Sequence, residues 1–157
     1  MTSLAIRQAS TAADLAHVRT LFEEYAAWLA VDLCFQGFDE ELATLPGAYA
    51  PPRGRLYLAG PGEAPFGCIA LRPLDDAAVG EVKRLYVRPA ARGQRLGEAL
   101  VRKLMDDARA IGYRELKLDT LEWMSDARKL YERLGFAPCP PYYHNPLPGA
   151  VYMSTAL

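Results

Sequence analysis

Residues 85–98 have the composition of a phosphate-binding turn between a strand and a helix. The first backbone N–H groups of a helix have no partner within it and lie at the positive end of the helix dipole, so they attract anions. Gly93 lets the chain turn sharply, Gly97 lets a ligand approach the backbone, and Arg92 and Arg95 add positive charge. The pattern predicts an anion site, although a turn of this composition also occurs in a purely structural role.

Other chemistries that bind phosphate or attack a carbonyl group have little support in the sequence. Neither the P-loop pattern G-x-x-x-x-G-K-[ST] nor the dinucleotide pattern G-x-G-x-x-G occurs at this turn. Cys34, Cys68 and Cys139 form no C-x-x-C pair. We expect buried thiols rather than a zinc site or a disulfide framework. His17 and His144 are far apart in the sequence, and no metal site is predicted.

The hydrophobic periodicity alternates between strands and amphipathic helices along the chain. Gly112 and Gly135 follow helical stretches, as helix-ending glycines do, and Pro89 ends the long strand before the turn. Hairpins come first and helix crossovers later, so we expect a single α/β domain over residues 1–157 with a mixed sheet. The predicted elements are strands at 4–7, 55–59, 66–71, 79–87, 116–121, 136 and 151–157, and helices at 11–29, 38–45, 94–111 and 127–134.

Two segments resemble motifs of the GNAT superfamily of N-acetyltransferases. The sequence R-G-Q-R-L-G at residues 92–97 is similar to the Q/R-x-x-G-x-G/A signature of motif A, and it follows a strand that ends in L-Y-V. The sequence A-R-K-L-Y-E-R-L-G-F at residues 127–136 is similar to A-x-x-L-Y-x-x-L-G-F. Arg95 replaces the usual middle glycine of the first motif, and Met124 stands where the family often has asparagine. The match extends over residues 56–136, about half of the chain.

The resemblance implies a mixed, mostly antiparallel sheet flanked by helices, in which two central parallel strands, 79–87 and 116–121, splay apart. Acetyl-CoA would lie between them, with its pantetheine arm against the backbone of the first strand and its pyrophosphate on the amides of the turn. The backbone amide near Leu85 would polarise the thioester carbonyl. The residues implied in binding acetyl-CoA are Leu85, Tyr86, Val87, Arg92, Gly93, Gln94, Arg95, Leu96, Gly97 and Glu98.

The resemblance also implies direct attack of an amine on the thioester, without a covalent enzyme intermediate. Tyr131 matches the general-acid tyrosine of the family, which protonates the departing thiolate, but its spacing is equally that of a core residue. The first candidate for the base that deprotonates the amine is Glu81, on the strand that carries the thioester, and the second is Asp119, at the end of the neighbouring strand. The structural alternatives are an ion pair with Lys83 or Arg84 for Glu81, and capping of the next turn for Asp119.

The sequence does not identify the acceptor amine, because acceptor pockets are built from loops and early helices that vary on one fold. Small amines, amino acids, antibiotics and protein N-termini all stay open. Residues 140–146, P-P-Y-Y-H-N-P, combine stiff prolines with flat, amphipathic tyrosines. They either form one wall of the acceptor pocket or cover the sheet edge.

The chain as a whole excludes some classes of partner. Its net charge is −1, so we expect no binding to nucleic acid or to an anionic membrane surface. It has neither a signal peptide nor an apolar run of roughly 20 residues, which predicts a cytoplasmic protein. The main competing interpretation is a catalytically silent, CoA-binding regulatory module, and a protein-binding domain is a third. A homodimer is compatible with all of them.

Overall fold

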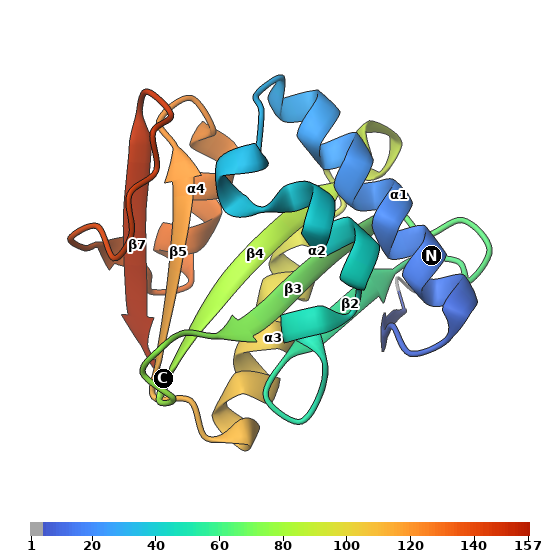
Figure 1. The fold of residues 1–157 in the computed structure, drawn as a ribbon, viewed down its shortest axis with the longest axis horizontal. Helices are drawn as coiled ribbons and strands as arrows, with labels where there is room; N and C mark the ends of the chain where they lie inside the picture. The colour runs from blue at the N-terminus through green and yellow to red at the C-terminus, as the bar shows by residue number, and fades with distance from the viewer. Residues whose placement is uncertain (1–4) are drawn as a thin grey trace.

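The computed structural model describes residues 5–157, which form a seven-stranded sheet with helices on both faces (Figure 1). The strands are β1 (Ile6–Gln8), β2 (Arg55–Ala59), β3 (Gly67–Pro73), β4 (Val79–Val87), β5 (Glu115–Leu121), β6 (Ala137–Pro138) and β7 (Ala150–Ala156). The helices are α1 (Ala12–Leu29), α2 (Phe38–Thr44), α3 (Leu96–Ile111) and α4 (Ser125–Arg133). Short 3₁₀ helices, η1 (Cys34–Gln36), η2 (Gly47–Tyr49) and η3 (Pro89–Ala91), lie in the connections.

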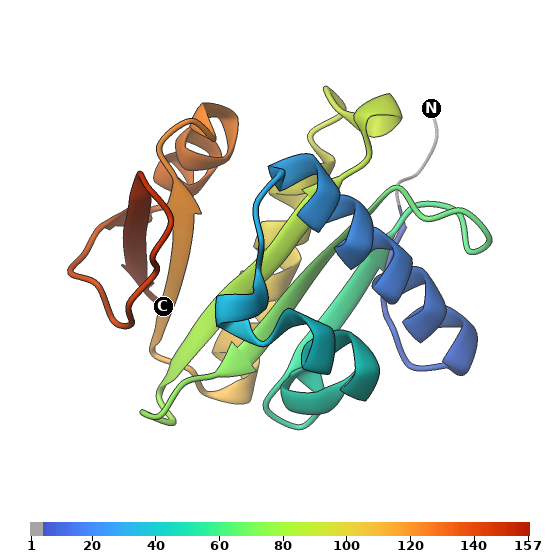
Figure 2. The same ribbon diagram turned by 45° about the horizontal axis from the view of Figure 1, so that its top comes forward.

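The strands follow the order β1-β2-β3-β4-β5-β7-β6, and every neighbouring pair is antiparallel except β4 and β5. This parallel pair is short, because only Val79–Glu81 of β4 is in register with Glu115–Lys117 of β5. Beyond these residues the two strands diverge, and β5 and β7 turn away from the rest of the sheet (Figure 2). The sheet therefore opens into a wedge whose narrow end lies at Glu81.

A β-bulge in β4 reverses the usual alternation of its side chains. The register between β3 and β4 shifts by one residue at Ile69, and Arg84 has a left-handed backbone with φ of 62°. A bulge places two successive residues opposite a single residue of the partner strand. Lys83 and Arg84 consequently lie on the same face of the sheet, where they contact Gln36 of η1 and Glu41 of α2. Two neighbouring cations thus lie against the α1–α2 layer.

The helices divide the hydrophobic core into two layers, one on each face of the sheet. α1 and α2 cover one face, with Val18, Leu21, Phe22 and Phe38 buried against it. α3 and α4 cover the other, with Leu96, Leu100, Leu104, Leu130 and Tyr131 among the buried residues. The packing of α3 on β2, β3 and β4 fixes its first turn beside the end of β4.

The predicted order and type of the elements are confirmed, with shifts at their ends. α2 ends at Thr44, α4 begins at Ser125, and the short strand predicted at residue 136 lies at Ala137–Pro138. The first strand is Ile6–Gln8, and residue 4 of the predicted strand lies outside the described residues. The prediction that all three thiols are buried holds for Cys68, but Cys139 is only partly buried and Cys34 is exposed beside Asp32.

Candidate functional site

Two neighbouring cavities, which share some of their lining residues, lie where β4 and β5 diverge. The turn cavity lies against the segment between β4 and α3 and has a volume of about 350 Å³. The inner cavity, of about 50 Å³, lies between α1, η1, β4 and the end of β5. Leu85, Met124 and Ala127 line both cavities. These three shared residues form the junction of the two cavities.

The turn before α3 presents open backbone N–H groups to the turn cavity. The first N–H of the helix with an internal partner is that of Ala99, which donates to the carbonyl of Arg95 at 3.1 Å. The preceding amides are those that an anion can occupy. Gly93 and Arg95 both have left-handed backbones, with φ of 85° and 57°. Arg95 thus adopts the left-handed conformation for which glycine is the usual residue. The turn therefore keeps its path although arginine stands in place of the family's glycine.

Most of the residues expected to bind acetyl-CoA line the turn cavity, namely Leu85, Val87, Arg92, Gly93, Arg95, Leu96, Gly97 and Glu98. Gln94 and Tyr86 are not among its lining residues. The Tyr86 side chain lies on the opposite face of the sheet, with its ring 6.1 Å from Tyr25 and 6.4 Å from Trp28 between centroids. Only the backbone of Tyr86 is therefore available to a ligand in the cleft.

The turn cavity also has a wall that sequence patterns did not reveal. Trp28, at the end of α1, lines it, and the Arg92 guanidinium lies 5.0 Å from the centre of the Trp28 ring. The Trp28 and Trp123 rings lie 5.4 Å apart, and both side chains are partly exposed. The periodicity of α1 predicts its buried stripe but not which residue at its end meets a distant turn.

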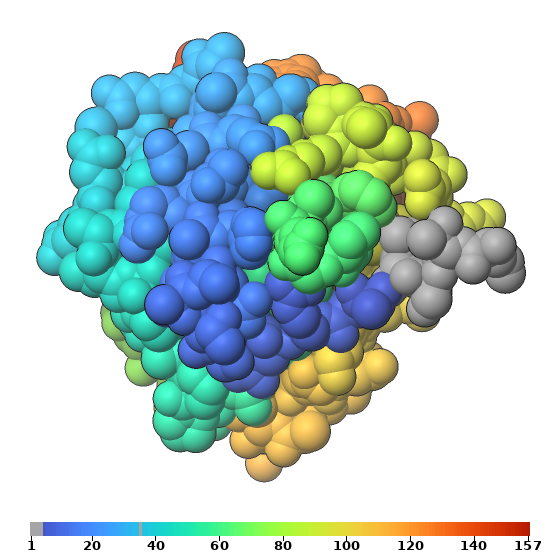
Figure 3. Space-filling model, turned by 90° about the vertical axis from the view of Figure 1, so that its right-hand side faces the viewer, coloured from blue at the N-terminus to red at the C-terminus, as the bar shows by residue number. Residues whose placement is uncertain are grey.

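Arg88 joins three segments around this wall. Its guanidinium pairs with the Glu24 carboxylate of α1 at 2.8 Å and donates to the Pro65 carbonyl of the β2–β3 hairpin loop at 2.9 Å. Figure 3 shows α1, this loop and the turn before α3 side by side on one surface. The ion pair and the hydrogen bond hold the turn in place relative to α1.

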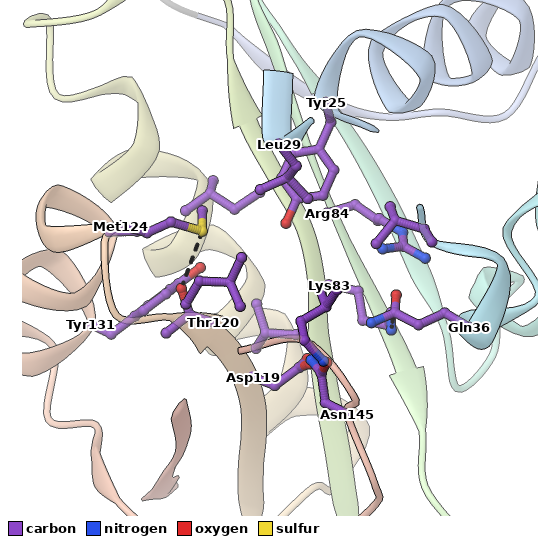
Figure 4. Close-up of a pocket in the computed structure, with 16 residues that line it drawn as sticks. Tyr25, Leu29, Gln36, Lys83, Arg84, Asp119, Thr120, Met124, Tyr131 and Asn145 are labelled. Atoms are coloured by element: carbon purple, nitrogen blue, oxygen red, sulfur yellow. Dashed lines mark hydrogen bonds between the residues drawn. The ribbon is translucent and has the colours of Figure 1, made fainter. Parts of the chain in front are cut away.

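The inner cavity contains the polar groups that face the junction (Figure 4). Asp119 and Tyr131, two of the three predicted proton-transfer residues, line it, together with Lys83, Arg84, Gln36 and Asn145. Glu81, the third, is not among the lining residues. Apolar side chains complete the wall, among them Leu29, Leu33 and Leu147.

Glu81 is fully buried at the narrow end of the wedge and is already engaged by other groups. Its Oε1 accepts a hydrogen bond from Arg72 Nε at 2.6 Å, and its Oε2 accepts one from the Tyr142 hydroxyl at 2.6 Å. Lys83 Nζ lies 4.0 Å from the same Oε1. The cross-strand ion pair considered from the sequence is thus formed mainly with Arg72 rather than with Lys83 or Arg84. A carboxylate held in this way is well placed to orient its neighbours.

Asp119 lies nearer to the junction, at the end of β5. Its Oδ2 accepts hydrogen bonds from the Tyr143 hydroxyl and from Asn145 Nδ2, the latter at 2.8 Å. Both donors come from the proline-rich loop, which therefore forms a wall of the inner cavity. Burial, followed by the nearby Asp119 charge, raises the pKa of the Tyr143 phenol, so that this hydroxyl remains a donor.

Tyr131 reaches the inner cavity from α4 while its ring packs in the core. The ring contacts Phe136 edge-on, with centroids 5.6 Å apart. Among residues 5–157, no side chain or backbone group forms a hydrogen bond with the Tyr131 hydroxyl. Burial raises the pKa of this phenol, with smaller contributions from Tyr25 and Asp119. The hydroxyl is therefore protonated at neutral pH and free to donate into the cavity.

Lys83 and Arg84 are the site residues that the sequence analysis considered only as ion-pair partners. The bulge in β4 is what turns both toward the inner cavity, and no local signal in the sequence predicts a bulge with a non-glycine residue at positive φ. Arg84 forms two hydrogen bonds with the Glu41 carboxylate, each of 3.0 Å. Lys83 donates to Gln36 Oε1 at 3.2 Å, and burial lowers its pKa from 10.5 to about 8.

Within residues 5–157, no group of three or more His, Cys, Asp or Glu side chains is arranged to hold a metal ion. Within the same residues, no helix has the length and hydropathy needed to cross a bilayer.

Comparisons with known proteins agree with the geometry. The sequence model of the Acetyltransferase (GNAT) family matches residues 18–136. An uncharacterised N-acetyltransferase of Schizosaccharomyces pombe is 42% identical over 142 residues, which cover 89% of this chain and 86% of the relative. A second uncharacterised N-acetyltransferase, from Dictyostelium discoideum, is 30% identical and covers 82% of this chain and 88% of its own.

Solved structures show the same fold. An acetyltransferase from Streptococcus agalactiae superposes with a TM-score of 0.82 over the full length of both chains, at 23% identity. The PaiA N-acetyltransferase of Thermoplasma acidophilum, solved in complex with coenzyme A, has a TM-score of 0.75 at 17% identity and covers 99% of this chain and 100% of its own. With the family match over most of the sequence, these findings establish that the chain belongs to the GNAT family of acetyltransferases, whose acyl donor is acetyl-CoA.

Proposed function

We propose that this protein transfers the acetyl group of acetyl-CoA to a primary amine by direct attack of the amine on the thioester. The observation that carries the proposal is the junction of the two cavities at Leu85, Met124 and Ala127. A pyrophosphate on the amides before α3 leaves the rest of CoA to run along β4 toward this junction. The acceptor amine then approaches from the inner cavity.

The backbone of β4 supports the proposed position of the donor. Pairing with β5 stops at Glu81, so the edge of β4 from Val82 to Val87 faces the cleft without a neighbouring strand. The pantetheine arm of CoA carries amide groups that can take the place of the missing strand. A backbone N–H near Leu85 would stabilise the negative charge that develops on the thioester oxygen.

Asp119 is our first choice for the base that accepts the proton of the amine. It lines the inner cavity, whereas the Glu81 carboxylate is held by Arg72 and Tyr142 outside it. A base must lie within hydrogen-bond reach of the proton it removes, directly or through one water. Glu81 is the second candidate, acting through an intervening group.

Tyr131 is the proposed general acid. The amine nitrogen forms a bond to the carbonyl carbon, and the carbon–sulfur bond then breaks with its electron pair on sulfur. The Tyr131 hydroxyl, which makes no hydrogen bond within residues 5–157, donates its proton to that thiolate. The proton taken from the amine by Asp119 restores the phenol through solvent, so the products are the N-acetyl amine and CoA thiol.

The experiment that tests the function is a thiol-release assay with acetyl-CoA and a panel of primary amines, run beside calorimetry of acetyl-CoA binding. Transfer predicts amine-dependent release of CoA and an acetylated amine identified by mass spectrometry. A catalytically silent CoA-binding module would bind acetyl-CoA without amine-dependent release. Failure to bind acetyl-CoA would contradict both interpretations.

A further inference from the structure

Lys83 is a buried cation in the wall of the inner cavity. Its side chain is 5% exposed. The ammonium donates to the neutral Gln36 side chain at 3.2 Å, and within the described residues its one carboxylate partner inside 4.0 Å is Glu81, at that limit. Glu81 is held more closely by Arg72 Nε, at 2.6 Å. Lys83 therefore shares a carboxylate whose stronger partner is another residue.

The charged groups around the inner cavity comprise two close ion pairs, here called closed pairs, and two further ions. The closed pairs are Arg72 with Glu81 and Arg84 with Glu41. The remaining ions are the cation of Lys83 and the anion of Asp119, which accepts hydrogen bonds from the neutral Tyr143 and Asn145 side chains. Both line the same cavity, and among residues 5–157 they do not approach within 4.0 Å of each other. The cavity thus presents separate positive and negative groups.

Burying an ammonium group without a close counter-ion is unfavourable, so its retention calls for a partner. Burial lowers the pKa of Lys83 to about 8, yet the group is still mostly protonated at neutral pH. An anion brought in by a ligand would complete its coordination. The Asp119 carboxylate, which accepts hydrogen bonds from two neutral donors at Oδ2, would meanwhile attract the amino group of the same ligand.

We propose that the acceptor is an amine that also carries a carboxylate, an amino acid or a close analogue, with the carboxylate bound by Lys83 and Gln36 and the amino group held at Asp119. This inference rests on the proposed transferase function and names the class of its acceptor. A zwitterion brings both charges that the cavity complements, whereas a simple ammonium ion would leave Lys83 with Glu81, 4.0 Å away and shared with Arg72, as its counter-ion.

A carboxylate suits the site better than a phosphate group. A phosphate monoester carries roughly two negative charges near neutral pH, but Lys83 is the single cation of the cavity left outside a closed pair, since Arg84 is engaged by Glu41 through two hydrogen bonds.

The test is a matched series of acceptors assayed with the unaltered protein. Each amino acid of an α- and ω-amino acid panel is compared with its primary amide and with the amine that lacks the carboxyl group. We expect kcat/KM for the best acids to exceed that of their amides by about 10- to 100-fold, because one hydrogen bond between charged groups is lost. Amides or plain amines that react as well as the acids would overturn the proposal.

Lys83→Met then tests the residue, since methionine keeps the length of the stem and removes the charge. The variant should lose the preference for acids through a higher KM for the acid, while its acetyl-CoA affinity is unchanged. Lys103→Met, on the exposed surface of α3, is the matched control and should keep the preference. An undiminished preference in Lys83→Met would overturn the role of Lys83.

Different results would contradict the transferase function and the amino-acid acceptor. If no amine of any kind releases CoA, the proposed transferase function fails. If amines without a carboxylate are acetylated and the amino acids are not, the function stands and the inference about the acceptor fails. The acceptor series needs no variant. It can therefore test whether the acceptor carries a carboxylate even if the Lys83→Met protein does not fold.

Discussion

The Tyr131 hydroxyl makes no hydrogen bond within residues 5–157. Its removal can therefore distinguish a general-acid role for Tyr131 from a role in core packing alone. Tyr131→Phe keeps the ring that packs on Phe136 and removes no internal hydrogen bond, so the free energy of unfolding should change by about 0.5 kcal/mol or less. A general-acid role predicts a fall in kcat of roughly 10²-fold, the low end for this kind of catalysis, because a thiolate is a good leaving group. We would measure the turnover, acetyl-CoA affinity and melting temperature of this variant. Normal turnover would contradict the general-acid role and leave Tyr131 as a core residue.

Asp119 and Glu81 can be separated by converting each carboxylate to its amide. Asp119→Asn should lower kcat/KM by about 10²-fold or more, because the amide cannot accept the proton of the amine. Glu81→Gln removes the negative partner of Arg72 but leaves the cavity wall intact, so its effect on kcat/KM should be smaller. Steady-state kinetics with one acceptor suffice. The reverse order of effects would make Glu81 the base.

At the scale of an element, the start of α3 combines an unusual residue with an open helix end. Arg95 occupies the N-cap with φ of 57° and no side-chain cap. A left-handed non-glycine residue costs roughly 1 kcal/mol, so Arg95→Gly should leave stability equal or raise it by up to about 1 kcal/mol. The matched control, Arg102→Gly in the interior of the same helix, should lower it by about 1 kcal/mol. Urea titration of both variants measures the difference, and a loss of stability in Arg95→Gly would contradict this interpretation.

Gly97 tests the anion site at the same helix end. A Cβ at this position would lie 3.5 Å from Leu130 Cδ2 and 4.0 Å from Val87 Cγ2, which are ordinary contacts. Gly97→Ala should therefore fold and bind acetyl-CoA, whereas the larger side chain of Gly97→Trp should fill part of the turn cavity. We expect calorimetry to show at least a tenfold weaker affinity for the tryptophan variant, on the order of 1.4 kcal/mol. Equal affinities in both folded variants would place the pyrophosphate elsewhere.

The elements that carry strong local signals were predicted well, and the rest depended on tertiary structure. The cap at Gly112 and the turn before α3 follow from neighbouring residues and are present. The bulge at Arg84 is different, because it is fixed by the packing of β4 between β3 and the α1–α2 layer. Sequence analysis consequently missed Lys83 as a cavity residue, and it could not place Trp28 against a turn more than sixty residues away.

At the scale of the whole molecule, Lys83 links pH to folding stability. Its folded pKa of about 8 lies below the ordinary value of 10.5, so between these pH values the unfolded chain binds the proton and the folded chain does not. Stability therefore rises with pH across this window, and below it the cost of the buried charge, on the order of 3 kcal/mol, is fully present. Glu81 and Asp119 oppose the lowering of this pKa, while Arg84 and Arg72 add to it.

Lys83→Met makes this linkage measurable. The variant should be more stable than the parent near pH 7, and its advantage should shrink steadily as the pH is raised toward 10.5. Chemical denaturation of both proteins at matched pH values gives the difference, in which the titration of all other groups cancels. An advantage that does not change with pH would mean that Lys83 keeps its ordinary pKa in the folded protein.

The short parallel register between β4 and β5 has a consequence for how the backbone exchanges hydrogen with solvent. From Val82 onward β4 lacks a partner on its β5 side, so amides on that edge face solvent and should exchange readily. A bound CoA chain that takes the place of the missing strand would slow their exchange with deuterium, while amides on the β3 side would be protected in both states. Comparing exchange maps with and without CoA should therefore show protection confined to alternate residues of a single strand and to the first turn of α3. Such a pattern would show that the ligand pairs with the edge of β4 as an additional strand of the sheet would.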